Sequence, residues 1–254
     1  MNLYLDVHGE TVSERFDSHC ENGQEVLTAA ESGFIHCPVW TDLPTVAEII
    51  DLANNQREHY IRLPCLIGMD LRWQQGPSQI HALSDDALRC MVAFQLTYGA
   101  GNTPNWFTHL VVEYPTLVAE VLIDYAGAAL KTKQLHIDSI YQLEHDPDYR
   151  MVAIIAVPVI LKHFPVRSKA NHLRYLEYLL KAALCYHIDQ LPMLLKKKMA
   201  LKSIDVAQKV YWLTVGMLFD PGQYEPALWQ YIGKSGSSLL HMGDRVKIRH
   251  KSQI

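Results

Sequence analysis

From about residue 84 onward, apolar side chains recur at the three- and four-residue spacing of amphipathic helices. Ser84, followed by two aspartates, predicts an N-cap, and the helix that it begins ends at Gly99. Pro115 begins the next predicted helix, whose apolar positions share one face: Val118, Val121, Leu122, Tyr125 and Ala129. Both segments therefore predict helices with one buried face.

The second half of the chain continues this pattern. Asp146-Pro147-Asp148 predicts the start of an apolar helix that continues from Tyr149 to His163, is buried between neighbours and is kinked by Pro158. Ser168 precedes the clearest amphipathic helix, which carries charged residues spaced for exposed ion pairs: Arg174, Glu177 and Lys181. Further helices are predicted from Asp189 to about Ala200, from Ser203 and Asp205 to Phe219, and, after a break at Asp220-Pro221-Gly222, from about Tyr224 to Ile232.

The connections between these predicted helices are mostly short, so consecutive helices should lie antiparallel as hairpins. Each helix has a broad apolar face, and none has the heptad seam of a coiled coil. The pattern favours an all-α fold, an α-solenoid of stacked antiparallel helix pairs of the HEAT-like kind, rather than a four-helix bundle. We assign residues 84–232 to this helical-repeat domain.

The two ends of the chain have weaker patterns. Residues 1–83 predict a helix-rich and loosely packed region, with a short strand from Asn2 to His8, helices from Gln24 to Glu31 and Asp42 to Asn54, and an apolar stretch from Tyr60 to Trp73 that Pro64 and Gly68 interrupt. Residues 233–254 predict a frayed basic tail.

The amino-acid composition indicates a cellular compartment and shows that charge is distributed unevenly along the chain. Apolar residues make up 49% of the 254, and the first residues lack the cationic and apolar parts of a secretory leader. With five widely spaced cysteines, this predicts a cytoplasmic protein without a membrane span. Residues 1–127 hold 17 acidic and 5 basic residues, whereas residues 128–254 hold 10 acidic and 18 basic ones. Such a chain could attract its own acidic half, a partner or an anionic polymer, but solvated faces of two different regions are the favoured explanation of the charges.

Two groups of residues have the chemistry of metal ligands. His136, Asp138, His145 and Asp146 could imitate the His/Asp ligands of an all-α metal-dependent hydrolase, although Asp146 is better explained as an N-cap. His19-Cys20 and His36-Cys37 offer four potential zinc ligands. Adjacent ligands do not converge easily on one tetrahedral ion, so solvated or core-lining roles are favoured. We therefore expect no metal site and no cofactor.

The sequence evidence for other functional motifs is weaker still. Gly233-Lys234-Ser235 resembles the end of a phosphate-binding loop, but Leu228 stands where the motif needs its first glycine. No nucleophile signature is present, so we expect no catalytic residues. The Lys196-Lys197-Lys198 run, with Lys202 and Lys209 nearby, fits a solvated helix end better than a phosphate contact. The tryptophans at helical spacing, Trp106, Trp212 and Trp229, are expected in the core.

A family resemblance covers roughly residues 85–232. It rests on three stretches: Asn105-Trp106 through Leu122, Asp146-Pro147-Asp148-Tyr149 through Arg167, and Asp205-Val206-Ala207-Gln208 through Leu213. These stretches resemble the C-terminal helical-repeat region of very large bacterial proteins with a NACHT-type NTPase module, similar to the STAND class used in phage defence. The resemblance implies an α-solenoid that recognises or positions something for an NTPase located elsewhere. No Walker motif accompanies it, so none of that ATP chemistry is carried over.

Together these patterns predict a non-catalytic binding or scaffold module and not an enzyme. Its partner is expected to be a protein, with nucleic acid the less favoured choice, and its binding residues are not identified by the sequence. One alternative is an all-α metal-dependent hydrolase built on His136, Asp138, His145 and Asp146. Another is a truncated remnant without independent function, since the helical array of the resembling proteins would be expected to continue further.

Overall fold

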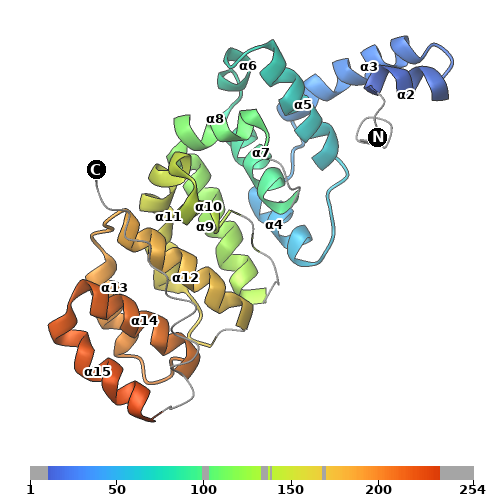
Figure 1. The fold of residues 1–254 in the computed structure, drawn as a ribbon. Coiled ribbons are helices and arrows are strands. Elements are labelled where there is room, and N and C mark those ends of the chain that lie inside the picture. The colour runs from blue at the N-terminus through green and yellow to red at the C-terminus, as the bar shows by residue number, and fades with distance from the viewer. Residues whose placement is uncertain (1–10, 99–102, 133–136, 138, 168–169, 235–254) are drawn as a thin grey trace.

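The computed structural model describes residues 11–98, 103–132, 137, 139–167 and 170–234. Within these ranges the chain forms fourteen α-helices and two short 3-10 helices, and no strand (Figure 1). The prediction of an all-α fold is confirmed. The predicted strand from Asn2 to His8 and residues 235–254 of the predicted tail lie outside the described residues, whereas Gly233 and Lys234, predicted to begin that tail, are the last residues of α15 (Pro221–Lys234).

The helices follow one another closely along the chain. The first half contains α2 (Val12–His19), α3 (Gly23–His36), η1 (Cys37–Val39), α4 (Val46–Asn54), α5 (Arg62–Gln75), α6 (Ser78–His81), α7 (Asp85–Tyr98), α8 (Asn105–Glu113) and α9 (Pro115–Thr132). The second half contains α10 (Gln142–His145), η2 (Pro147–Tyr149), α11 (Arg150–His163), α12 (Ala170–Cys185), α13 (Leu191–Met199), α14 (Val206–Phe219) and α15 (Pro221–Lys234).

Several predicted helix starts are confirmed by their caps. The Ser84 hydroxyl accepts a hydrogen bond from the Ala87 amide at 3.3 Å, and α7 begins at the next residue. Asp146 accepts from the amide of Asp148 at 3.0 Å and caps η2, which leads into α11. Asp205 caps α14 in the same way. Side chains that accept hydrogen bonds from the first amides therefore set these boundaries.

Several predicted boundaries were wrong, among them the end of α3, which continues to His36 rather than ending at Glu31. Helix α4 begins at Val46 rather than near Asp42, because Thr45 and Glu48 form a capping box. The N-cap of α13 is Gln190 rather than Asp189. Helix α15 begins at Pro221 and is longer than predicted, since Asp220 accepts from the Gln223 amide at 3.2 Å and proline is favoured at a first helical position.

Helix α5 was not predicted, because Pro64 and Gly68 appeared to interrupt it. Pro64 lies in the first turn, where the missing amide would have no helical partner in any case. Gly68 lies where α5 crosses α3, and a Cβ atom there would overlap the backbone of Phe34. The glycine is therefore a requirement of helix packing and not a helix end.

A hydrophobic cluster of buried residues extends from Ile49 to Leu228 and includes residues on both sides of position 84. The assigned division at residue 84 stays a prediction. Trp106 and Trp212 are fully buried, as predicted, but Trp229 is 57% exposed and its indole donates to Glu225 at 3.1 Å. Helix α11 packs against α9, α12 and α13, which confirms that this apolar helix is buried between neighbours.

Helices pack mainly on those near them in the chain. Helix α2 packs on α3, α3 on α5, α7 on α4 and α9, α9 on α11, α11 on α12, and α14 on α13 and α15. Figure 1 shows the result as a row of helices, with α2 and α3 at one end and α13 to α15 at the other. Within the described residues, no single helix has the length and apolarity to cross a membrane; α8 and α9 pass such a test only together, and they are bent by 106° at Tyr114.

Candidate functional site

The residues predicted as a hydrolase cluster are only partly described. His136 and Asp138 lie outside the described residues. Asp146 caps η2, and His145 is the last residue of α10. No three His, Cys, Asp or Glu side chains in the described part of the chain gather closely enough to hold a metal ion together. The metal-dependent hydrolase therefore stays a prediction without support from the described geometry.

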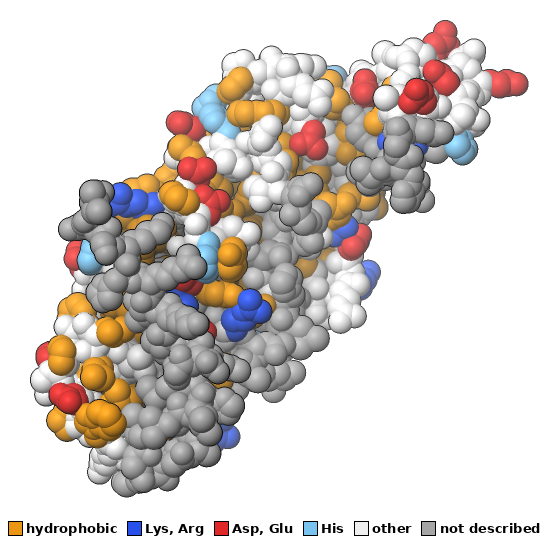
Figure 2. Space-filling model, in the orientation of Figure 1, with side chains coloured by type: hydrophobic (Ala, Val, Ile, Leu, Met, Phe, Trp, Pro, Cys, Tyr) orange, Lys and Arg blue, Asp and Glu red, His pale blue; other side chains and the backbone are white. Residues whose placement is uncertain are grey.

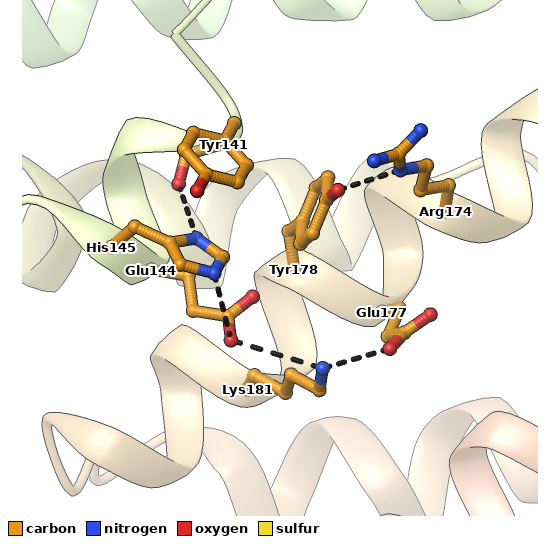
Figure 3. A network of polar contacts seen from close by, with 7 residues as sticks. All are labelled: Tyr141, Glu144, His145, Arg174, Glu177, Tyr178 and Lys181. Atoms are coloured by element: carbon orange, nitrogen blue, oxygen red, sulfur yellow. Dashed lines mark hydrogen bonds and ion pairs between the residues drawn. The ribbon is translucent and has the colours of Figure 1, made fainter. Parts of the chain in front are cut away.

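His145 instead belongs to a network of polar contacts between α10 and α12 (Figure 3). Its ring stacks on Tyr141, with 3.9 Å between ring centroids, and its Nε2 lies 3.7 Å from the Glu144 carboxylate. The Lys181 ammonium lies 3.8 Å from Glu144 and 2.8 Å from Glu177. Lys181 thus links α10 to α12.

The predicted ion pairs of α12 form only in part. Glu177 pairs with Lys181, but Arg174 donates to the Tyr178 hydroxyl at 2.6 Å instead of pairing with a carboxylate. Burial raises the pKa of the Glu144 carboxyl, while Lys181 opposes that effect. Each of these groups is explained by its contacts with its neighbours, which fix α10 against α12.

The predicted lysine run at the end of α13 is divided. Lys196 and Lys197 are exposed, but Lys198 is only 4% exposed, so the expectation of a wholly solvated run was wrong. The Lys198 ammonium donates to the Phe164 carbonyl at 2.8 Å and faces the Trp212 ring. Burial lowers its pKa to about 8. Lys198 therefore caps the C-terminal end of α11, where a cation is favoured by the helix dipole.

The two His-Cys pairs do not meet in the structure. The His19 ring bonds the Arg15 carbonyl, and the His36 ring bonds the Ser32 carbonyl at 2.7 Å. Both are contacts within a single helix. The Cys37 thiol, whose pKa is raised by burial, lies against the Gly33 carbonyl. His19 and His36 are the last residues of α2 and α3, and Cys20 and Cys37 are the C-caps of these helices.

A groove opens elsewhere, where α3 meets η1 and α5. It encloses about 630 Å³ and is mostly apolar, with Ala30, Phe34, Trp40, Tyr60 and Pro64 among its lining residues. We call it the apolar groove. Trp40 is 54% exposed and Tyr60 78% exposed, so both rings stand at the edge of the groove with much of their surface in water. The volume lies in the range of binding sites for small molecules or a few side chains.

Local contacts fix the shape of the apolar groove. The Arg72 guanidinium, 8% exposed, donates to the Ile35 carbonyl at 2.8 Å and to the Gln79 carbonyl at 3.4 Å. It therefore ties the end of α3 to α5 and α6. The close crossing at Gly68 sets the separation of α3 from α5. These contacts place the groove on rigid elements rather than on a loop.

A second hollow of about 870 Å³ lies beside the first and carries acidic side chains, Asp42, Glu48 and Asp51. We call it the acidic hollow. Its lining includes Thr41 and His59, whose chain neighbours Trp40 and Tyr60 line the apolar groove. The rings of His59 and Tyr60 stack with 4.6 Å between centroids, so this pair separates the two hollows.

Local hydrogen bonds favour the charged state of one carboxylate of the acidic hollow, that of Glu48. The Glu48 carboxylate accepts from the Thr45 amide and hydroxyl, each at 2.8 Å, and these bonds lower the pKa of Glu48. In Figure 2, acidic side chains also gather over α2 and α3, at the end of the molecule that carries the groove. The surroundings of the groove therefore favour positively charged groups.

Comparison with known proteins gives no matching family model, curated protein or solved structure. The candidate site therefore rests on its own geometry. The sequence identified no binding residues and placed only the helical-repeat domain at 84–232, whereas the apolar groove and the acidic hollow are lined by residues 30–64. No local signal in the sequence singled out Trp40 and Tyr60, each of which has an apolar chain neighbour, Val39 and Ile61.

Proposed function

We propose that this chain is a non-catalytic helical-repeat module that binds a partner protein through the apolar groove. The partner segment presents an apolar side chain to the groove and basic side chains to the acidic hollow. One observation carries the proposal: Trp40 and Tyr60 stand largely exposed at the edge of an apolar groove. Tryptophan and tyrosine are the residues that most often dominate the binding energy of protein interfaces.

The fold supports the same role. Helices that pack on their chain neighbours in a row are typical of HEAT-like solenoids, which act by offering an extended surface. We propose that the present helices form such a solenoid, and that it positions a partner as the resemblance to NACHT-associated repeat regions implies. All five cysteines are free thiols, which supports action in the reducing cytoplasm.

The charge around the groove favours a basic partner. Asp42, Glu48 and Asp51 share one hollow, and the first half of the chain is strongly acidic. Charge complementarity raises association rates and selects against acidic competitors. Nucleic acid, which is itself an anion, would be repelled by this surface, so a protein partner is the better fit.

The test is selection from a random peptide display library with the full chain as bait, followed by titration of synthetic peptides. We expect the selected peptides to share an aromatic or aliphatic anchor next to Lys or Arg. Trp40→Ala and Tyr60→Ala should each weaken their binding at least about tenfold, the effect of removing an interface hot spot.

Trp229→Ala is the matched control, because Trp229 is exposed to a similar extent but lies in α15, away from the groove. It should leave the affinity unchanged. Peptides that bind Trp40→Ala as tightly as the wild type, or an enriched set without any apolar anchor, would overturn the proposal. Acidic rather than basic flanking residues would overturn its electrostatic part.

A further inference from the structure

Two histidines meet on the surface between α6 and α8, away from the apolar groove. His81 is the last residue of α6 and His109 lies in α8, and both helices pack on α5. Their Nε2 atoms are 3.2 Å apart, and their rings are nearly perpendicular, with 5.1 Å between centroids. The two side chains thus direct the same ring nitrogen toward one point.

The orientation of His81 is fixed from its other side. The Tyr114 hydroxyl lies 2.7 Å from His81 Nδ1. When the Tyr114 oxygen accepts a hydrogen bond from Nδ1–H, the lone pair of His81 is on Nε2, the atom that faces His109. A hydrogen bond of this kind to the second ring nitrogen is the usual support of a metal-binding histidine.

The geometry matches two ligands of one metal ion. With Zn–N bonds of about 2.05 Å at a tetrahedral angle, the two ligand nitrogens lie about 3.3 Å apart, and ring centroids about 1.2 Å farther back are about 5.3 Å apart. The observed separations are 3.2 Å and 5.1 Å. Both distances therefore agree with convergence on a single ion.

Electrostatics gives a reason for a cation at this point. Two Nε2 lone pairs that face each other repel, so one nitrogen must carry a proton in the metal-free chain. That proton removes the repulsion in the metal-free chain, and a divalent cation between the two nitrogens takes its position. Neutral imidazole is a preferred ligand of zinc, copper and nickel.

We propose that His81 and His109 form a two-histidine binding site for a divalent late transition-metal ion, with Tyr114 as the positioning residue of His81. Two protein ligands leave the remaining coordination positions to water or to another ligand. The site goes beyond the proposed function, since it involves neither the apolar groove nor the acidic hollow. It was also not expected from the sequence, in which 81 and 109 are far apart.

The test is calorimetric titration of Zn²⁺ into the reduced full chain and its variants. The wild type should bind one Zn²⁺ ion. In His81→Ala and in His109→Ala, the affinity for this ion should fall at least about tenfold, or binding should be lost. Tyr114→Phe should weaken this binding about tenfold, the lower end of the range for a residue that orients a ligand. His163→Ala is the matched control, because that exposed ring bonds its own helix, at the Val159 carbonyl, and no other partner among the described residues.

Wild-type Zn²⁺ binding that survives both histidine substitutions, or that His163→Ala reduces equally, would overturn the site. The site would also be overturned if the wild type bound no Zn²⁺ at about 100 μM, a concentration at which even a weak site is measurably occupied. A second measurement needs no variant: anomalous scattering at the zinc edge from crystals of the wild type. A peak within bonding distance of both Nε2 atoms supports the proposal, and zinc found only elsewhere contradicts it.

Discussion

Gly68 of α5 passes so close to Phe34 of α3 that the space for a side chain is taken by the Phe34 carbonyl oxygen. The ring of Pro38 closes the same space, 3.0 Å from the position that a Cβ atom would take. Because Phe34 and Pro64 both line the apolar groove, this crossing also determines the groove's width. A single glycine therefore connects helix packing with the proposed binding surface.

We expect Gly68→Ala to destabilise the protein by about 1–3 kcal/mol, the usual effect of overpacking. The backbone of α3 would have to move, since a carbonyl oxygen is not a flexible side-chain end. Urea unfolding measures the change. Gly127→Ala is the control: it lies within α9 with open space around it, and should stabilise by up to about 1 kcal/mol. Equal effects of the two substitutions would contradict this account of the crossing.

Arg72 should be needed for both stability and peptide binding. Arg72→Met removes the two hydrogen bonds that hold the Ile35 and Gln79 carbonyls, and we expect a loss of about 2 kcal/mol in the free energy of unfolding. Arg72→Lys should recover little, because an ammonium lacks the fork that reaches both carbonyls. Arg57→Met, at an exposed site, should change the stability by less than about 0.5 kcal/mol.

Lys198 should make stability depend on pH in the alkaline range. Its pKa is about 8 in the folded chain and about 10.4 when unfolded, so the unfolded chain binds more protons between these values. The contribution of Lys198 to stability is therefore complete above about pH 10.4 and is lost as the pH falls through 8. Compared with Lys198→Met, the wild type should gain on the order of 1–2 kcal/mol from pH 7.5 to 9.5. Parallel urea-unfolding profiles for the two proteins would contradict the burial of this ammonium.

Glu144 should have the opposite effect in the acid range, where it should make stability fall as the pH rises. Burial raises the pKa of its carboxyl, so the folded chain holds this proton more tightly than the unfolded chain, where the pKa is about 4.3. Its contribution to stability is present below about pH 4.3 and is lost as the pH rises through the folded value. Glu144→Gln should lack this dependence, so its stability should fall less than that of the wild type between pH 4 and 7. Chemical unfolding at four pH values across that range decides the point.

The sequence predicted most helices because their ends carry local chemistry. Ser84, Asp146 and Asp205 cap their helices through hydrogen bonds to residues two or three positions away, so a short stretch of sequence contains the whole cause. Helix α5 was missed for the opposite reason. The need for Gly68 arises from a backbone more than thirty residues earlier, and no local pattern contains that contact.

Burial of polar residues was equally hard to predict. Lys198 has the same local sequence as its exposed neighbours Lys196 and Lys197, and only the approach of Phe164 and Trp212 encloses it. The groove likewise forms from residues of α3, η1 and α5, which are brought together by packing. The sequence identified helix chemistry, whereas hollows and enclosed charges depend on tertiary structure.

The row of helices has a consequence for how the chain folds and opens. Most close packing joins helices that follow one another, such as α2 with α3 or α14 with α15, so few contacts require long loops to close. Chains with such local contacts fold within microseconds to milliseconds. The terminal pairs have fewer neighbours than α9 and α11, which are packed from several sides. Amide hydrogens should therefore exchange first at the two ends of the row and last in α9 and α11.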